Sequence, residues 1–182
     1  LGKVGDVVLL RAETASGSEW QVKDLFVREF RSYQFVWHSF KMATDNTHLR
    51  MKYSVDNGSN WSTGNYHTQG GSWVNGGTTN PINEESQSNG NVVAGLGNQG
   101  AAGNEGGGHV IWIFDPLNPQ ARKYHLSHCS NYKYDAEVAY SGVAGSWQSS
   151  DAVNAVKFYP GSGDFDNTNV NYNQVSIYGY RY

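Results

Sequence analysis

The strongest constraint on the fold is an alternation of apolar and polar side chains with a period of two residues. It is clearest in residues 49–55, where the odd-numbered residues are apolar and the even-numbered residues are polar. Successive side chains of a β-strand point to opposite faces, so this pattern predicts a strand that is buried on one side. A helical period is nearly absent from the chain. We therefore expect an all-β protein.

Similar patterns predict eight further strands, separated by turn-forming residues. The nine expected strands cover residues 4–10, 20–26, 33–42, 49–55, 109–114, 123–129, 136–140, 153–159 and 174–180. Residues 33–42 are apolar on both faces, which predicts a central strand or a strand whose outer face meets another subunit. The 22 glycines and the aromatic content of 14% favour many turns and many half-buried strands. We predict one antiparallel β-sandwich domain over residues 1–182, jelly-roll-like and forming the C-terminal part of a longer chain.

Two Gly- and Asn-rich stretches lack a clear strand pattern. Residues 70–108 contain three glycine runs and few apolar residues. Because loops longer than about 12–15 residues usually have a function, we expect an ordered functional loop inserted in the sandwich. Residues 160–173 form a shorter loop of the same chemistry. Its Asp164 and Asp166 are possible calcium ligands, but the loop lacks the terminal glutamate of an EF-hand, and calcium binding is left open.

The sharpest short motif is the Asp-box pattern S-x-D-x-G-x-x-W at residues 54–61. Asp56 is expected to accept hydrogen bonds from backbone amides, Gly58 to adopt a positive φ, and Trp61 to fold back as an apolar plug. We interpret the motif as a structural hairpin. Sialidases carry several such boxes, and a single box without internal repeats does not predict that activity.

Charge and composition exclude several functions. A formal charge of −3 provides no basic field for nucleic acid, and no apolar run approaches the ~20 residues of a membrane helix. His125, His128 and Cys129 lie on one predicted strand, where they are too far apart to share a coordination sphere, so we expect no metal there within one chain. A trimer axis that collects one histidine from each subunit is left open. No nucleophile motif and no committed pair of carboxylates is present. We therefore expect no cofactor, no catalytic residue and no enzyme activity.

Aromatic residues beside the Gly-rich segments are the best candidates for a binding site. Sugar rings stack on aromatic faces, and amide side chains hydrogen-bond the sugar hydroxyls. The alternative is that these rings cap the ends of the core. The candidate binding residues are Tyr66, Trp73, Tyr140, Trp147 and Tyr172.

Five segments together resemble a known family. They are RSYQFVW at residues 31–37, LRMKYSVDNG at 49–58, HVIWIFDP at 109–116, AVNAVKFY at 152–159 and VSIYG at 175–179. Their order and spacing resemble the C-terminal β-sandwich domains of tail-fibre and related virion proteins of tailed phages, especially aquatic ones. The resemblance covers most of the chain except residues 70–108.

The resemblance implies a homotrimer located on the virion, at the phage tail or particle surface, that attaches to a host-surface glycan through its loops. An alternative is a structural virion protein, such as a head-decoration or connector-fibre domain, whose loops contact neighbouring virion proteins. A third is a carbohydrate-active enzyme or its binding module. The family has no shared catalytic residues, so none is carried over to this chain.

Overall fold

The computed structural model describes residues 5–74, 79–99, 105–132 and 138–181. The described residues form twelve strands and no helix. The strands are β1 (Val7–Thr14), β2 (Trp20–Lys23), β3 (Ser32–Phe40), β4 (Thr47–Ser54), β5 (Tyr66–Val74), β6 (Thr79–Gln87), β7 (Asn91–Gln99), β8 (Gly106–Phe114), β9 (Lys123–Tyr132), β10 (Val138–Trp147), β11 (Ala155–Pro160) and β12 (Gln174–Tyr180).

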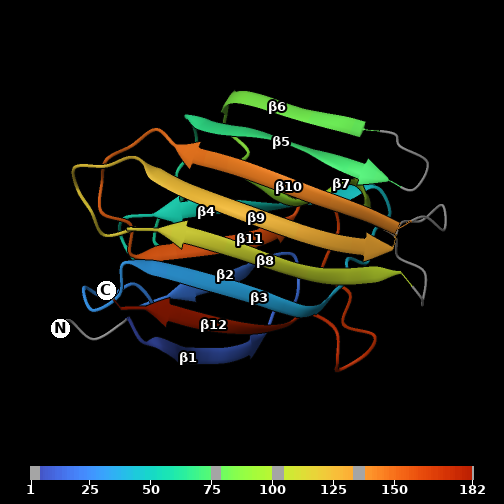
Figure 1. Cartoon of the computed structure of the whole chain (residues 1–182), viewed down its shortest axis with the longest axis horizontal. Coiled ribbons are helices and arrows are strands. Elements are labelled where there is room, and N and C mark those ends of the chain that lie inside the picture. Colours follow the sequence, from blue (N-terminus) through green and yellow to red (C-terminus); the bar gives the residue numbers. More distant parts are fainter. Residues whose placement is uncertain (1–4, 75–78, 100–104, 133–137, 182) are drawn as a thin grey trace.

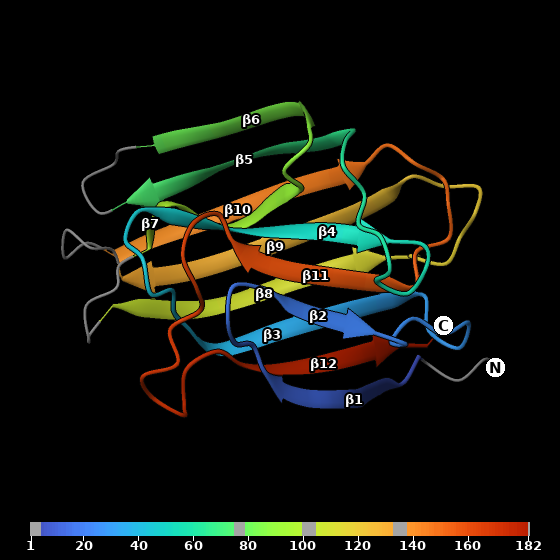
Figure 2. The ribbon, with the colours of Figure 1, turned by 180° about the vertical axis from the view of Figure 1, so that it is seen from behind.

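The strands form two antiparallel sheets that pack face to face (Figure 1). The large sheet has the order β1-β12-β3-β8-β9-β10-β5-β6, and the small sheet has the order β2-β11-β4-β7. Figure 2 shows the small sheet in front of the large one. The predicted all-β antiparallel sandwich is confirmed. Its jelly-roll-like detail, its extent as one domain and its place in a longer chain stay predictions.

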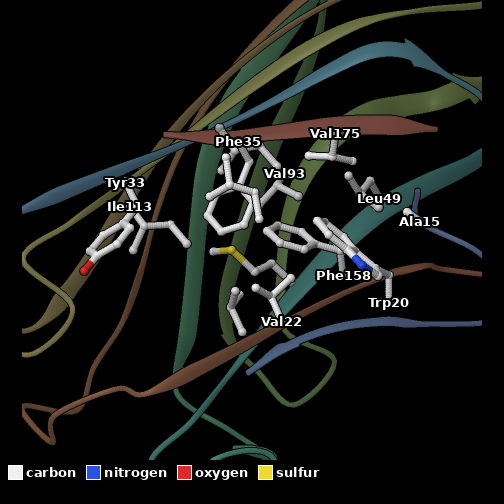
Figure 3. Close-up of a cluster of buried hydrophobic side chains, with 14 of the residues drawn as sticks. Ala15, Trp20, Val22, Tyr33, Phe35, Leu49, Val93, Ile113, Phe158 and Val175 are labelled. Atoms are coloured by element: carbon white, nitrogen blue, oxygen red, sulfur yellow. The ribbon is translucent and has the colours of Figure 1, made fainter. Parts of the chain in front are cut away.

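The core lies between the two sheets and is rich in aromatic rings (Figure 3). Phe158 of β11 is at the centre, with its ring centroid 5.1 Å from Phe35 and 5.0 Å from Trp37 of β3. Trp20 of β2 stacks on Phe158 at 5.7 Å. Burial of each such side chain contributes about 1.5–3 kcal/mol, so this cluster is a main source of the cohesion between the sheets.

The predicted alternation holds in β4 as far as Tyr53 but fails at Val55, which follows the end of the strand and is 46% exposed. Leu49, Met51 and Tyr53 are fully buried against the large sheet, whereas Arg50 and Lys52 point outward. The prediction of a central strand is also confirmed, because β3 pairs with β12 on one side and with β8 on the other. All nine expected strands have counterparts, with boundaries that differ by a few residues at most ends. The expected strand at residues 136–140 begins outside the described residues and continues to Trp147.

The prediction of a loop over residues 70–108 is wrong. The described part of this segment forms most of β5, all of β6 and β7, and the start of β8. The glycines that suggested a loop instead let backbones approach closely. A Cβ atom on Gly70 would lie 2.3 Å from the carbonyl oxygen of Gly142 in β10, which is closer than any side chain allows. Sheet pairing here overrides the low strand propensity of glycine.

The Asp56 motif forms the expected turn but not a hairpin. Asp56 accepts hydrogen bonds from the backbone and side-chain nitrogens of Asn60 at 2.8 and 2.7 Å and from the Ser54 hydroxyl at 2.7 Å, and Gly58 has a φ of 83°. These bonds lower the pKa of Asp56 to about 2. The hairpin prediction fails because β4 and β5 belong to different sheets, so the turn starts a crossover.

None of the described residues belongs to a helix long and apolar enough to cross a membrane.

Candidate functional site

Over most of its width, the outward face of the large sheet lacks acidic side chains and the basic side chains of Lys and Arg. We define the neutral face as the outward positions of β12, β3, β8, β9, β10 and β5. Among the residues that the structure describes there, none is Asp, Glu, Lys or Arg. The outward-facing aromatic and aliphatic residues of this face include Val36, Trp73, Val110, Trp112, Phe114, Tyr124, Leu126, Tyr132, Val138, Tyr140, Ala144, Tyr178 and Tyr180.

The outward face of the small sheet is charged by contrast. Lys23, Arg50, Lys52 and Lys157 occupy its outward positions. Burial and the nearby Lys157 and Arg50 lower the pKa of Lys52. The two sheets shield the same core but present opposite chemistry to the outside. A large apolar surface without charge is typical of a binding surface. The neutral face is therefore a candidate binding surface.

At one end of the neutral face, three rings from three neighbouring strands form a row that we call the stack, in which Trp73 is tilted by 30° and His128 by 20° to the ring of Tyr140. Trp73 of β5 is the direct register partner of Tyr140 in β10, and their ring centroids lie 5.6 Å apart. His128 of β9 stacks on the other side of Tyr140 at 5.9 Å, and a hydrogen bond of 2.5 Å joins its Nδ1 to the tyrosine hydroxyl. Trp73 is 50% exposed and Tyr140 is 44% exposed, so the stack presents ring surface to the outside.

Small residues make room for this stack. His128 faces Gly142 across the β9–β10 pair, and Gly142 faces Gly71 across the β10–β5 pair. A Cβ atom on Gly142 would lie 3.4 Å from the Tyr140 hydroxyl and 3.7 Å from His128 Nδ1, so both side chains lie over this glycine. The glycines therefore explain why the two rings lean together along the sheet instead of standing apart.

The other end of the same strands holds a pocket of about 280 Å³. Tyr124 of β9, which is half exposed, lies on one side, and Gln69 and Asn83 supply amide groups on the other. His67 and Ala144 also line the pocket, and Glu84 and Glu85 of the edge strand β6 line its rim outside the neutral face. From His67 to Trp73 along β5 the distance is about 20 Å at the usual strand rise. The stack and the pocket thus form two ends of one elongated surface, which we call the β5–β10 surface.

Two predicted binding residues are not available to a ligand. Tyr66 is fully buried and Trp147 is 8% exposed, and both rings pack against Tyr53 in the core. The Tyr66 hydroxyl accepts a hydrogen bond from the backbone nitrogen of Tyr53 at 2.9 Å. The prediction fails for these two because both are inward-facing residues of the same strands that carry Trp73 and Tyr140 outward. The structure thus brings Trp73 and Tyr140 together on the surface and places Tyr66 and Trp147 in the core.

Tyr172 lies apart from this surface, in the loop between β11 and β12. It is half-buried, and the Lys41 ammonium lies 4.7 Å from its ring centroid. Lys41 also pairs with Asp166 at 3.2 Å inside the protein. Burial acts to raise the pKa of Asp166, but hydrogen bonds from Thr168 and the Lys41 ammonium outweigh it and lower the pKa. The Asp166 carboxylate therefore already has a cation, which disfavours a calcium role for this loop.

The histidines and cysteine of β9 are arranged as expected for a strand. His125 and Cys129 are buried on the inner side, whereas His128 is exposed on the neutral face. Among the described residues, no group of three or more His, Cys, Asp or Glu side chains is placed to hold a metal ion.

Sequence reasoning missed Tyr124, His128, Gln69 and Asn83 as members of the surface. Tyr124, Leu126 and His128 alternate along the expected strand of residues 123–129, so its outward face was visible as a pattern. Asn83 lies in the segment that the sequence presented as a loop, and Gln69 directly precedes that segment, so no local signal identified them.

Comparison with known proteins adds no assignment, because no family model, curated protein or solved structure matches this chain.

Proposed function

We propose that the chain is an attachment module that binds a neutral glycan along the β5–β10 surface. The observation that carries this proposal is the exposed Trp73–Tyr140–His128 stack on a sheet face without charged side chains. Aromatic faces pack against the C–H faces of sugar rings and bury their apolar area. The stack supplies such a platform at one end of the surface.

The polar groups of the surface suit sugar hydroxyls. Gln69 and Asn83 each carry one acceptor and two donors in a planar amide, and they lie beside Tyr124 at the pocket. The described part of the neutral face holds no Lys or Arg, so a glycan carboxylate or sulfate would meet no ammonium or guanidinium group there. The length of the surface favours an oligosaccharide over a single sugar.

The biological setting that we propose is the surface of a virion, with the chain acting as a tail-fibre-type domain in a homotrimer. The support for this setting is the sequence resemblance of the five segments described above. The glycan would then belong to the surface of the host cell. In this role the domain binds and does not catalyse.

The carboxylates near the pocket fit a binding role. Glu84 forms two contacts with the Arg50 guanidinium, at 3.0 and 3.2 Å, which commits its carboxylate to the charged side of the sandwich. Glu85 is the other carboxylate along the pocket. Glycoside hydrolysis requires two carboxylates that both face the substrate, and the ion pair of Glu84 does not favour such a pair.

A second candidate function is assembly with another copy of this chain. Val7 and Leu9 of β1 are each 56% exposed, and they continue the neutral face at the edge opposite Trp73, beside Tyr178 and Tyr180 of β12. A surface without charge can face a copy of itself without like-charge repulsion. This apolar half of the face favours the structural virion role, in which the contact is with protein.

A glycan array tests the first candidate. The wild-type chain is expected to bind neutral oligosaccharides, and Trp73→Ala or Tyr140→Ala is expected to weaken that binding at least tenfold, a typical loss for a stacking residue. Trp61→Ala is the matched control, because Trp61 lies against Lys157 on the charged sheet. Equal binding by all four proteins would contradict the proposal, and release of sugar products would favour the enzyme reading.

Sedimentation and particle labelling test the setting. The proposal predicts a trimer in sedimentation equilibrium and labelling of the virion tail by antibodies to the chain. A monomer at high concentration would count against the fibre role, and labelling of the head would favour the decoration role.

A further inference from the structure

We propose that a second pocket, at the end of the sandwich where β8 ends and β9 begins, binds a sugar that carries a carboxylate. This cavity of about 410 Å³ lies between the loop before β3 and the loop after β8. Its lining residues are Arg28, Phe30, Arg31, Asp115, Leu117, Asn118, Pro119 and Ala152. The volume lies in the range of ordinary small-molecule sites. The pocket is separate from the neutral face and differs from it in charge.

The cations at this pocket outnumber the carboxylate that lines it. Arg28 and Arg31 line the pocket with the single carboxylate Asp115, and Arg31 contacts both oxygens of that carboxylate at 3.2 and 3.4 Å. Arg28 makes no ion pair or hydrogen bond with any residue that the structure describes. A guanidinium presents a planar fork of N–H donors that matches a carboxylate. Arg28 is therefore the group that a carboxylate ligand would meet.

The walls of the pocket are held in place before any ligand binds. The Asp115 backbone nitrogen donates to the Arg31 carbonyl at 2.6 Å, which joins the two loops. Asp115 has a φ of 42°, an uncommon conformation for a residue other than glycine. The buried Lys123 ammonium donates to the carbonyls of Asn118 and Ala121 at 2.5 and 2.6 Å and so holds the loop after β8. A rigid pocket loses little entropy on binding.

Hydrogen bonds also hold the loop before β3 in place. The Tyr33 hydroxyl accepts a hydrogen bond from the Val27 nitrogen at 2.7 Å and donates to the Val27 carbonyl at 2.9 Å. Phe30 is buried at the base of the pocket, and the Arg181 guanidinium lies over its ring at 5.3 Å. Arg181 is neutralised by Glu29 and Asp6. This balance leaves Arg28 as the cation available to an acidic ligand.

The apolar part of the lining sets the ligand class. Phe30, Leu117 and Pro119 offer C–H and ring surface, and Asn118 offers an amide. A small inorganic anion would leave this surface uncovered. A sugar acid places a carboxylate on Arg28, a ring face on the apolar residues and hydroxyls near Asn118 and Asp115, and thus uses all three features.

Titration calorimetry with four small ligands tests the proposal. Methyl glucuronide and N-acetylneuraminate carry the carboxylate on different rings, methyl glucoside lacks it, and inorganic sulfate lacks the ring. We expect binding of at least one sugar acid, no binding of the glucoside, and a weaker affinity at high salt. Arg28→Gln is expected to weaken the binding at least tenfold, whereas Arg122→Gln, outside the pocket, keeps it.

Three results would overturn the proposal. They are no binding of either sugar acid at millimolar concentration, equal binding by the Arg28→Gln variant, and binding of sulfate as tight as that of the sugar acids. Trp73→Ala is expected to retain sugar-acid binding, which separates this pocket from the β5–β10 surface.

Discussion

Two buried histidines should make the fold sensitive to mild acid. His109 of β8 and His125 of β9 are 1% and 2% exposed, and His109 stacks on Trp37 at 5.6 Å. Burial disfavours the charged ring and lowers the pKa of each to about 3. The same side chains in the unfolded chain have a pKa near 6.5. Below about pH 6.5 the unfolded chain therefore binds protons that the folded chain does not bind. The free energy of unfolding falls as a result.

The size of the effect follows from these pKa values. Each histidine contributes about 1.4 kcal/mol per pH unit while only the unfolded chain is protonated, so two histidines lower the free energy of unfolding by up to about 4 kcal/mol between pH 6.5 and pH 5. The whole free energy of unfolding of a domain of this kind is about 5–15 kcal/mol. Three carboxylates also have lowered pKa values in the folded chain, namely Asp56, Asp166 and Glu19. Their contributions to the free energy of unfolding are lost at lower pH, so the change between pH 6.5 and pH 5 reports on the histidines.

Urea unfolding followed by tryptophan fluorescence measures how the free energy of unfolding changes with pH across this range. His109→Gln and His125→Gln are each expected to halve the slope, whatever their cost at neutral pH. His38→Gln is the control, because His38 is exposed and bonds only Ser176 among the described residues. A free energy of unfolding that is constant from pH 6.5 to pH 5, or an unchanged slope in both buried variants, would refute the reasoning.

Three substitutions test the packing of the sheets and loops. Gly70→Ala should cost more than about 2 kcal/mol, because its methyl group would lie 2.3 Å from a backbone oxygen, whereas Gly64→Ala, with open space around it, should change the free energy of unfolding by less than about 0.5 kcal/mol in urea titrations. Asp166→Asn should cost about 3–5 kcal/mol by leaving the buried Lys41 ammonium without its anion, and a melting temperature equal to wild type would contradict this. Tyr33→Phe should cost about 1–3 kcal/mol and raise amide exchange at Val27, and unchanged exchange would show that the hydroxyl does not hold the loop.

The sequence predicted the fold class well because the strongest signals were local. The alternation in β4 and the apolar β3 depend on which side chains face the core, and a single strand carries that information. Strands β5 to β7 were missed because Gly, Asn and Ser have low strand propensity, and their pairing depends on β10 and β4, which lie far away in the sequence.

The site was predicted only in part for a similar reason. Trp73 and Tyr140 were identified from their neighbours, but a strand places alternate residues on opposite faces, so the register decides that Tyr66 and Trp147 are buried. The pocket beside Arg28 joins loops from three parts of the chain, and no short motif predicts such a cavity.

The most direct test of the account places one charge on each face of the sandwich. Ala144→Lys adds an ammonium to the exposed β5–β10 surface, and Gln21→Lys adds one to the outward face of the small sheet. Binding to a neutral glycan identified on the array is measured for both, with melting temperatures to establish that both are folded. The account predicts that Ala144→Lys loses binding at least tenfold and that Gln21→Lys binds as wild type. Wild-type binding by folded Ala144→Lys, or loss of binding in Gln21→Lys alone, would contradict it.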